Sequence, residues 1–118
     1  MVFRNMEEQS TYTLRNQEME KMSFGEEELE DFLEDMLVTP DQFVVLTAPK
    51  AQNQQIRYVQ ARVHEEEEEI EVELGIEEAD GTHLYYKMCG EEECFQVFLD
   101  FFHNGLTVNL KAYQPVAF

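Results

Sequence analysis

The chain has 118 residues, with 26 Asp or Glu against 8 Lys or Arg, so its formal net charge is −18 at pH 7. A chain of this length is expected to fold as one domain with a substantial core. The charge argues against nucleic acid and anionic lipid as partners, and the nine Phe and five Tyr argue against a fully disordered chain. The sequence has no apolar run long enough to span a membrane, so we expect no membrane partner.

The N-terminal part of the chain is polar and weakly patterned, and we predict that residues 1–22 form a loosely ordered arm. Residues 23–118 are predicted to form a single domain. It begins with an amphipathic helix over 23–37, because apolar residues recur there at the spacing of a buried helical stripe. We expect Ser23 and Glu26 to form a capping box at the start of this helix.

Strands are predicted next, from β-branched and alternating apolar residues. They cover 43–47, 56–63, 70–77 and 83–89. The clearest pattern is EEEEEIEVEL over 65–74, where aliphatic side chains alternate with glutamates and therefore lie on opposite faces of a strand. Asp80-Gly81 between two strand patterns predicts a hairpin. We therefore predict an antiparallel meander with an apolar inner face and a strongly anionic outer face.

A second helix is predicted over 91–103, with three glutamates in its first turn and an aromatic stripe facing the core. Alternating apolar residues then predict a last strand over 106–113. The predicted fold is a single α+β domain in the order α-β-β-β-β-α-β, with both helices packed on one face of the sheet.

Few residues suggest catalysis or metal binding. Cys89 and Cys94 are five residues apart, and His83 and His103 complete no recognised zinc spacing with them. No glycine-rich phosphate loop is present, and carboxylates are so numerous that pairing among them carries no information. We therefore expect no enzyme activity, no metal and no cofactor, and we interpret the two cysteines as reduced thiols of a cytoplasmic protein.

The acidic outer strand face is the predicted partner-binding surface, because exposed aromatics among charged side chains are common interface anchors. Tyr85 is placed on this face as the anchor, with His83 beside it. The predicted binding residues are Glu66, Glu68, Glu71, Glu73, Glu77, Asp80, His83 and Tyr85.

In size, charge, lack of catalytic motifs and α+β element order, residues 23–113 resemble the small acidic immunity proteins of bacterial polymorphic-toxin and contact-dependent inhibition systems. The resemblance implies a cytoplasmic antitoxin that binds a basic toxin, such as a nuclease domain, and occludes its active cleft. No individual residue role is carried over, because the resemblance has no sequence motif.

Two other binding functions are compatible with the same features. A nucleic-acid mimic that blocks a defence nuclease would have the same charge. A small acidic chaperone of the type III secretion kind would have a similar element order and would hold an unfolded segment through apolar contacts. An inhibitor differs from a chaperone in the steep salt dependence of its association. Monomer and homodimer both remain open.

Overall fold

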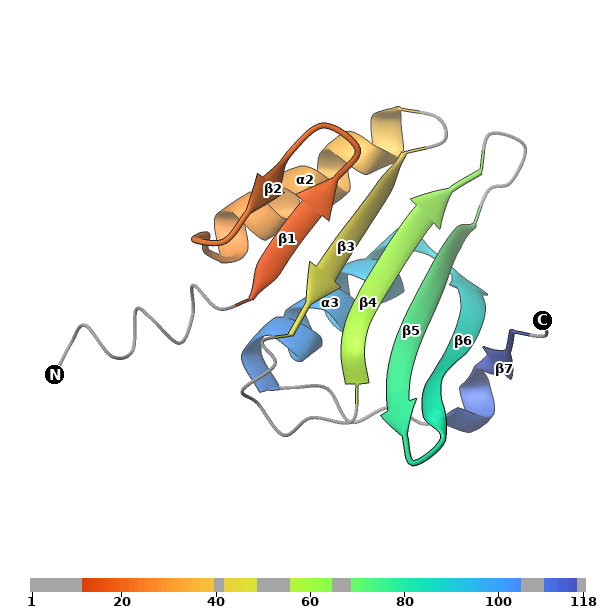
Figure 1. The fold of residues 1–118 in the computed structure, drawn as a ribbon. Helices are drawn as coiled ribbons and strands as arrows, with labels where there is room; N and C mark the ends of the chain where they lie inside the picture. The colour runs from red at the N-terminus through yellow and green to blue at the C-terminus, as the bar shows by residue number, and fades with distance from the viewer. Residues whose placement is uncertain (1–11, 40–41, 49–55, 65–68, 105–109, 117–118) are drawn as a thin grey trace, which may run out of the picture.

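A computed structural model of the chain describes residues 12–39, 42–48, 56–64, 69–104 and 110–116. It confirms the single α+β domain: two helices cover one face of a seven-stranded antiparallel sheet of order β2-β1-β3-β4-β5-β6-β7 (Figure 1). The elements are β1 (Thr13–Asn16), β2 (Glu20–Lys21), α2 (Glu26–Val38), β3 (Phe43–Thr47), β4 (Ile56–Val63), β5 (Ile70–Glu78), β6 (Gly81–Cys89), α3 (Glu91–Asn104), the 3-10 turn η1 (Leu110–Ala112) and β7 (Gln114–Pro115).

The core lies between the helices and the aliphatic face of the central strands. Val72 and Leu74 of β5 are fully buried there, together with Val59 of β4. A register shift between Ile56 and Tyr58 inserts one extra residue into β4, so Ile56 faces the core in addition to Val59. Because of this bulge, simple alternation does not describe the inward face along the whole of β4.

Helix α2 buries the predicted stripe but begins later than predicted. Its N-cap is Gly25, no side chain caps it, and the Leu29 amide donates to the Gly25 carbonyl at 3.2 Å. The capping box of Ser23 and Glu26 is therefore wrong. Glu26 is itself the first helical residue, and its carboxylate lies 2.6 Å from Nε2 of His103 at the end of α3. The acidic first turn still interacts favourably with the helix dipole.

Residues 12–21, which we predicted to belong to a loose arm, instead form β1, β2 and their turn. Leu14 is fully buried and β1 pairs along its whole length with β3. The Tyr12 hydroxyl donates to the Phe101 carbonyl at 3.3 Å, and the Tyr12 ring packs edge-on against the rings of Phe101 and Phe102. These contacts join the segment to elements far along the chain, so local patterning could not reveal them.

The predicted last strand over 106–113 is wrong for its described part. Residues 106–109 lie outside the described ranges, and Leu110–Ala112 is a 3-10 turn. The strand comes later, as β7, and pairs with Tyr85 and Tyr86 of β6. Tyr113 is buried just before it, with the Lys87 ammonium 4.7 Å from its ring centre.

Candidate protein-binding surfaces

The register of the β5–β6 hairpin separates the predicted binding residues. Residues directly opposite each other in neighbouring strands share a face of the sheet. Glu73 lies opposite Tyr86, whereas Tyr85 lies opposite the buried Leu74 and His83 lies opposite the buried Ile76. Tyr85 and His83 therefore lie on the helix-covered face and do not share a face with Glu73. The prediction that Tyr85 is an outward anchor among the glutamates is wrong.

A two-residue turn places Tyr85 and His83 on the helix-covered face. Ala79 and Asp80 form the turn, and Gly81 follows with a φ of +127°, which glycine adopts readily. The turn pairs Glu78 with Gly81 and fixes every later pair of the hairpin. A slip of one residue would exchange the two faces of β6.

The other predicted residues lie in three places. Glu71, Glu73 and Glu77 lie on the face of the sheet that no described helix covers, which we call the open face. Asp80 lies in the hairpin turn. Glu66 and Glu68 lie outside the described residues.

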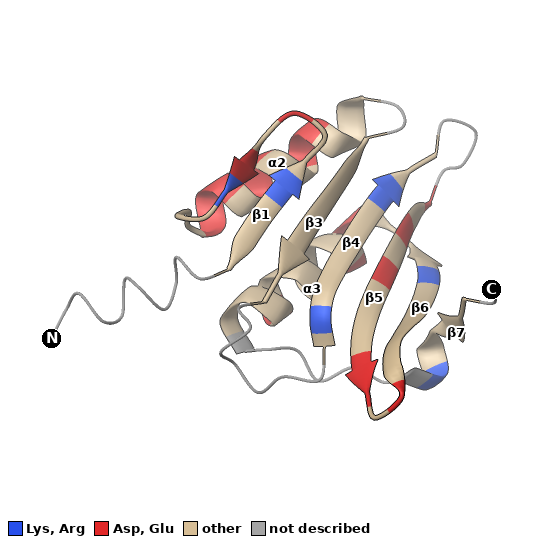
Figure 2. Cartoon of the chain, in the orientation of Figure 1, with Lys and Arg blue, Asp and Glu red and all other residues tan. Residues whose placement is uncertain are grey.

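The open face has mixed charge, and the predicted strongly anionic face is wrong for its described part. Figure 2 shows Lys or Arg positions on β1 and β4 and Asp or Glu positions on β5, and the strand register places the side chains named next on this face. The bases are Arg15, Arg57 and Arg62, and the acids are Glu20, Glu71, Glu73 and Glu77. Apolar and aromatic side chains fill the positions between them, which are Phe43, Val45, Tyr58, Leu84, Tyr86 and Met88.

Tyr58 crosses the open face from β4 to β5. Its ring lies over Gly75, where a Cβ atom would come within 2.1 Å of a ring carbon. The Tyr58 hydroxyl donates to the Glu73 carboxylate at 2.7 Å. Partial burial and this hydrogen bond raise the pKa of Tyr58 well above its usual range. Gly75 is thus needed for close side-chain approach, a role that the sequence pattern did not indicate.

The strongest anionic surface is on the other side of the molecule. We call the solvent-facing sides of α2 and α3 the helix layer. Helix α2 carries seven Asp or Glu and α3 carries four, and neither helix contains Lys or Arg. The described Lys and Arg are all in strands except Lys111, which is in η1. The sequence places these acids in both predicted helices, but our predicted binding surface lay on the strands.

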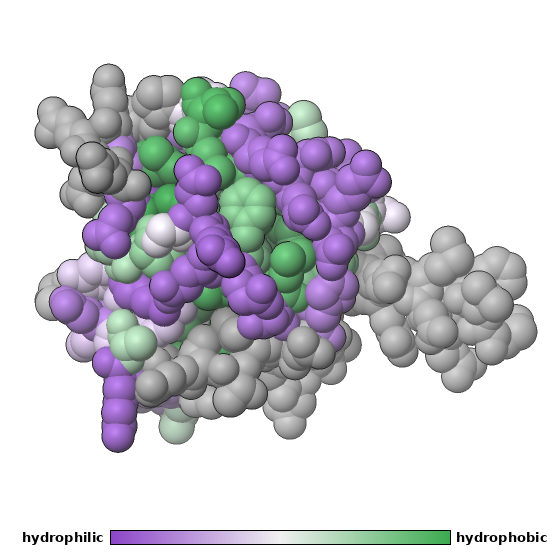
Figure 3. Space-filling view, turned by 180° about the vertical axis from the view of Figure 1, so that it is seen from behind, coloured by the Kyte–Doolittle hydropathy of each residue, from purple (hydrophilic) through white to green (hydrophobic). Residues whose placement is uncertain are grey.

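An apolar groove lies within the helix layer. Phe95 and Leu99 of α3 are partly buried, pack against the core, and line the groove together with Glu91, Glu92 and Gln96. Figure 3 shows hydrophobic side chains reaching the surface between hydrophilic ones on this side of the molecule. An apolar centre with an acidic rim is the composition expected of a protein-binding surface.

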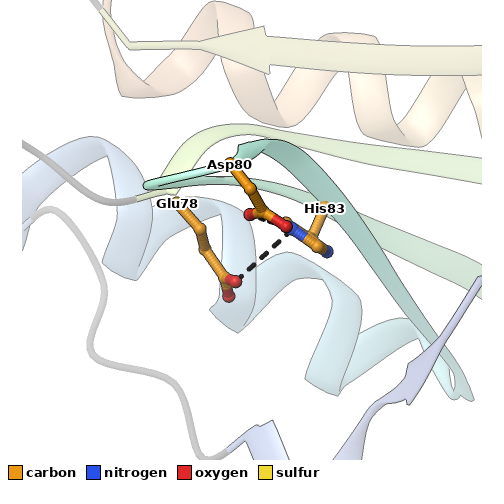
Figure 4. A group of neighbouring side chains, drawn as sticks. All are labelled: Glu78, Asp80 and His83. Carbon is orange, nitrogen blue, oxygen red and sulfur yellow. Dashed lines mark hydrogen bonds and ion pairs between the residues drawn. The ribbon is translucent and has the colours of Figure 1, made fainter.

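Glu78, Asp80 and His83 form a compact cluster at the β5–β6 hairpin (Figure 4). Nε2 of His83 lies 2.7 Å from the Asp80 carboxylate and 3.5 Å from that of Glu78. The hydrogen bond between His83 and Asp80 raises the pKa of His83 and lowers the pKa of Asp80. These three side chains have the donor atoms of a divalent-metal site. However, the two carboxylates favour a proton on the imidazole, and that proton competes with a metal.

The two cysteines do not converge with the histidines. Both are buried free thiols, and burial raises the pKa of Cys89 to about 11 and that of Cys94 to about 12. His83 contacts Asp80, and His103 contacts Glu26. Both thiols are therefore protonated at neutral pH and unsuited to nucleophilic chemistry.

Searches against protein-family models, curated proteins and solved structures found no match to the chain. Among the described residues, no helix is both long and apolar enough to cross a membrane.

Proposed function

We propose that this protein binds a basic protein partner through the helix layer and inhibits it, as an immunity protein inhibits a toxin. The observation that supports this proposal is the separation of charge between the two sides of the domain. The helices carry acids without Lys or Arg, whereas the described bases lie on the strands and η1. A partner approaching the helix layer therefore meets mainly negative charge, with Lys21 paired to Glu28 and Lys87 paired to Glu93 at its margins.

Electrostatics and packing have separate roles in this interaction. Acids spread over two neighbouring helices attract a cationic surface from a distance and speed its association. The groove at Phe95 and Leu99 then offers apolar contact area for a side chain of the partner, with Glu91 and Glu92 at its rim. Charge at the rim determines mainly the association rate, and packing at the centre determines mainly the dissociation rate.

A nuclease-like toxin domain fits this surface because a nuclease cleft must be basic to hold a phosphate backbone. A rigid acidic layer covering that cleft excludes the substrate because it binds the same basic side chains. A nucleic-acid mimic directed at a defence nuclease would use the same surface and the same physics. The two differ in the biological origin of the nuclease.

The chaperone alternative rests on the apolar groove instead of the acids. A chaperone would bind an extended segment at Phe95 and Leu99 with little dependence on ionic strength. Salt dependence therefore separates the two functions. It also identifies which feature of the helix layer determines affinity.

Two charge-matched triple variants test the proposal. The first, Glu27→Gln, Asp31→Asn and Glu34→Gln, neutralises three exposed acids of α2. The control, Glu18→Gln, Glu20→Gln and Glu69→Gln, neutralises three exposed acids outside both helices. Each protein is immobilised and used to capture partners from a lysate of the source organism at low salt, with elution by high salt and identification by mass spectrometry.

The proposal predicts that wild type and control capture the same basic protein and that the α2 variant loses most of it. The captured protein is then purified, and its activity is measured with and without wild type. Equal capture by the two triple variants, or a captured protein whose activity wild type leaves unchanged, would contradict the proposal. Capture that resists high salt would favour the chaperone.

A further inference from the structure

The open face has a chemical symmetry that the strand register makes explicit. Across the four central strands, one row of side chains reads Phe43, Arg62, Glu71 and Met88. The order is apolar, basic, acidic, apolar. The next row reads Val45, Gln60, Glu73 and Tyr86, in the order apolar, polar, acidic, aromatic.

Such rows are complementary to themselves under a two-fold rotation. An axis parallel to the strands, passing between β4 and β5, brings β4 of one copy over β5 of another and β3 over β6. Arg62 of each copy then faces Glu71 of the other, and Phe43 faces Met88. In the second row Gln60 faces Glu73, whereas Val45, opposite Tyr86, is buried within its own chain. A two-fold interface repeats each contact, so one favourable pair supplies two.

Sheet packing tolerates this arrangement. Stacked sheets lie about 10 Å apart with strand directions within roughly 30° of each other. Neighbouring rows are two residues, about 7 Å, apart along the strand, so a 30° rotation moves the outer rows sideways by about 3.5 Å. This sideways shift is less than one strand spacing of about 4.8 Å, and a long Arg side chain can span a strand spacing.

The net charge of −18 makes two copies repel at a distance, but little of that charge lies at this contact. The acids of α2 and α3 lie on the far side of the sheet, whereas the described part of the open face carries three Arg against four Glu. Arg62 is exposed and forms no ion pair with any described residue. The Arg62 guanidinium is therefore available to a second chain, whereas the Glu71 carboxylate already lies 3.0 Å from Nε2 of His64 in its own chain.

We propose that the open face binds a second copy of this chain and forms a two-fold sheet-on-sheet dimer with reciprocal Arg62–Glu71 pairs. Helices cover the opposite face, so the dimer leaves the helix layer of both copies free. The five strands β1 and β3–β6 offer a patch roughly 24 Å wide and 17 Å long, at the small end of specific interfaces. We expect a weak dimer that dissociates on dilution.

Charge reversal at one pair tests the orientation as well as the contact. Arg62→Glu gives a chain with acids at both positions, and Glu71→Arg gives a chain with bases at both. Each variant alone places like charges opposite each other twice across the two-fold axis and should self-associate at least roughly tenfold more weakly than wild type. A mixture of the two restores both opposite-charge pairs, as does the double variant R62E/E71R.

Sedimentation equilibrium over a wide concentration range is the readout. We expect wild type, the double variant and the equimolar mixture to approach twice the monomer mass of 14.0 kDa, and each single variant to remain near it. Each chain in the mixture keeps its own like-charged neighbours. Recovery on mixing therefore reports contacts between chains and not repaired folding. Glu34→Arg on α2 is the control and should self-associate like wild type.

Three results would overturn the proposal. The first is a wild-type protein that stays monomeric at the highest attainable concentration. The second is a single variant that dimerises like wild type. The third is a mixture of folded variants that gains no mass. Circular dichroism of each variant shows whether it is folded.

Discussion

The substitution Gly75→Ala tests quantitatively whether the Tyr58 ring packs on Gly75. In a strand interior, Gly→Ala alone is expected to stabilise by about 0.5–1 kcal/mol, because alanine loses less backbone entropy on folding. Here the added Cβ would lie 2.1 Å from one carbon of the Tyr58 ring and 2.5 Å from another. The ring must therefore leave its position across β5.

Moving the ring has two costs. Overpacking in a well-packed site costs about 1–3 kcal/mol. The hydrogen bond from Tyr58 to the charged Glu73 is lost as well, although its partial exposure reduces the contribution below the usual 1.5–3 kcal/mol for a bond to a charged group. We expect Gly75→Ala to lower the free energy of unfolding by about 1–3 kcal/mol.

A double-mutant cycle with Tyr58→Ala, measured by urea denaturation, isolates the cause. When the ring is absent, Gly75→Ala should be neutral or stabilising by about 0.5–1 kcal/mol. If Gly75→Ala destabilises equally in both backgrounds, or stabilises the wild type, then the close packing of Tyr58 on Gly75 is refuted.

Three further predictions concern other parts of the fold. Leu14 is fully buried, so Leu14→Ala should destabilise the fold by about 2–5 kcal/mol in urea denaturation. The Met19 side chain is 48% exposed, so Met19→Ala should change stability by less than about 0.5 kcal/mol. Equal effects would mean that β1 is not part of the core. The pKa of His83 is raised in the folded state, so protonation of His83 stabilises the fold below the usual pKa of 6.5, and this stabilisation is lost as pH rises through the folded pKa. The stability difference between wild type and His83→Gln should therefore shrink as pH rises above 6.5. A difference that does not change with pH would exclude the ion pair. Burial holds the pKa of Cys94 at about 12, so a thiol reagent at mildly alkaline pH should label neither cysteine in the native protein and both in denaturant, and rapid native labelling of Cys94 would contradict its burial.

Local patterns predicted the central sheet accurately. Strands β3 and β4 occupy the residues predicted from their β-branched and alternating sequences, and the buried stripe of α2 follows its periodicity. In α3 the aromatic stripe is confirmed in part, because Phe98 is buried whereas Phe95 and Phe102 are only partly buried. Asp80-Gly81 correctly indicated the hairpin. In each of these segments, local propensity and the tertiary structure agree.

The binding surface predicted on the strands was wrong because its composition depends on register. Alternation in β6 says that Tyr85 and Tyr86 face opposite ways, but only the turn decides which of them faces the helices. The strands β1 and β2 were not predicted for a different reason. Four residues of β1 carry little local signal, and their stability comes from pairing with β3 and from Tyr12 against Phe101.

The C-terminal error shows tertiary packing overriding a pattern. Alternating apolar residues predicted a strand through Tyr113, but Leu110–Ala112 turns so that Tyr113 is buried beside Lys87. Lys87 also pairs with Glu93 in the first turn of α3. The contact between Lys87 and Tyr113 connects residues more than 20 apart in sequence, and no local window contains both.

The proposed function requires that acids of the helix layer attract a basic partner. Its most direct test is the association rate of the purified partner with wild type, the α2 triple variant and the control triple variant, each measured across a range of salt concentrations. The proposed function predicts a rate that falls steeply with salt, a several-fold slower rate for the α2 variant at low salt, and a control rate close to wild type. Equal rates for the two triple variants, or a wild-type rate indifferent to salt, would contradict it.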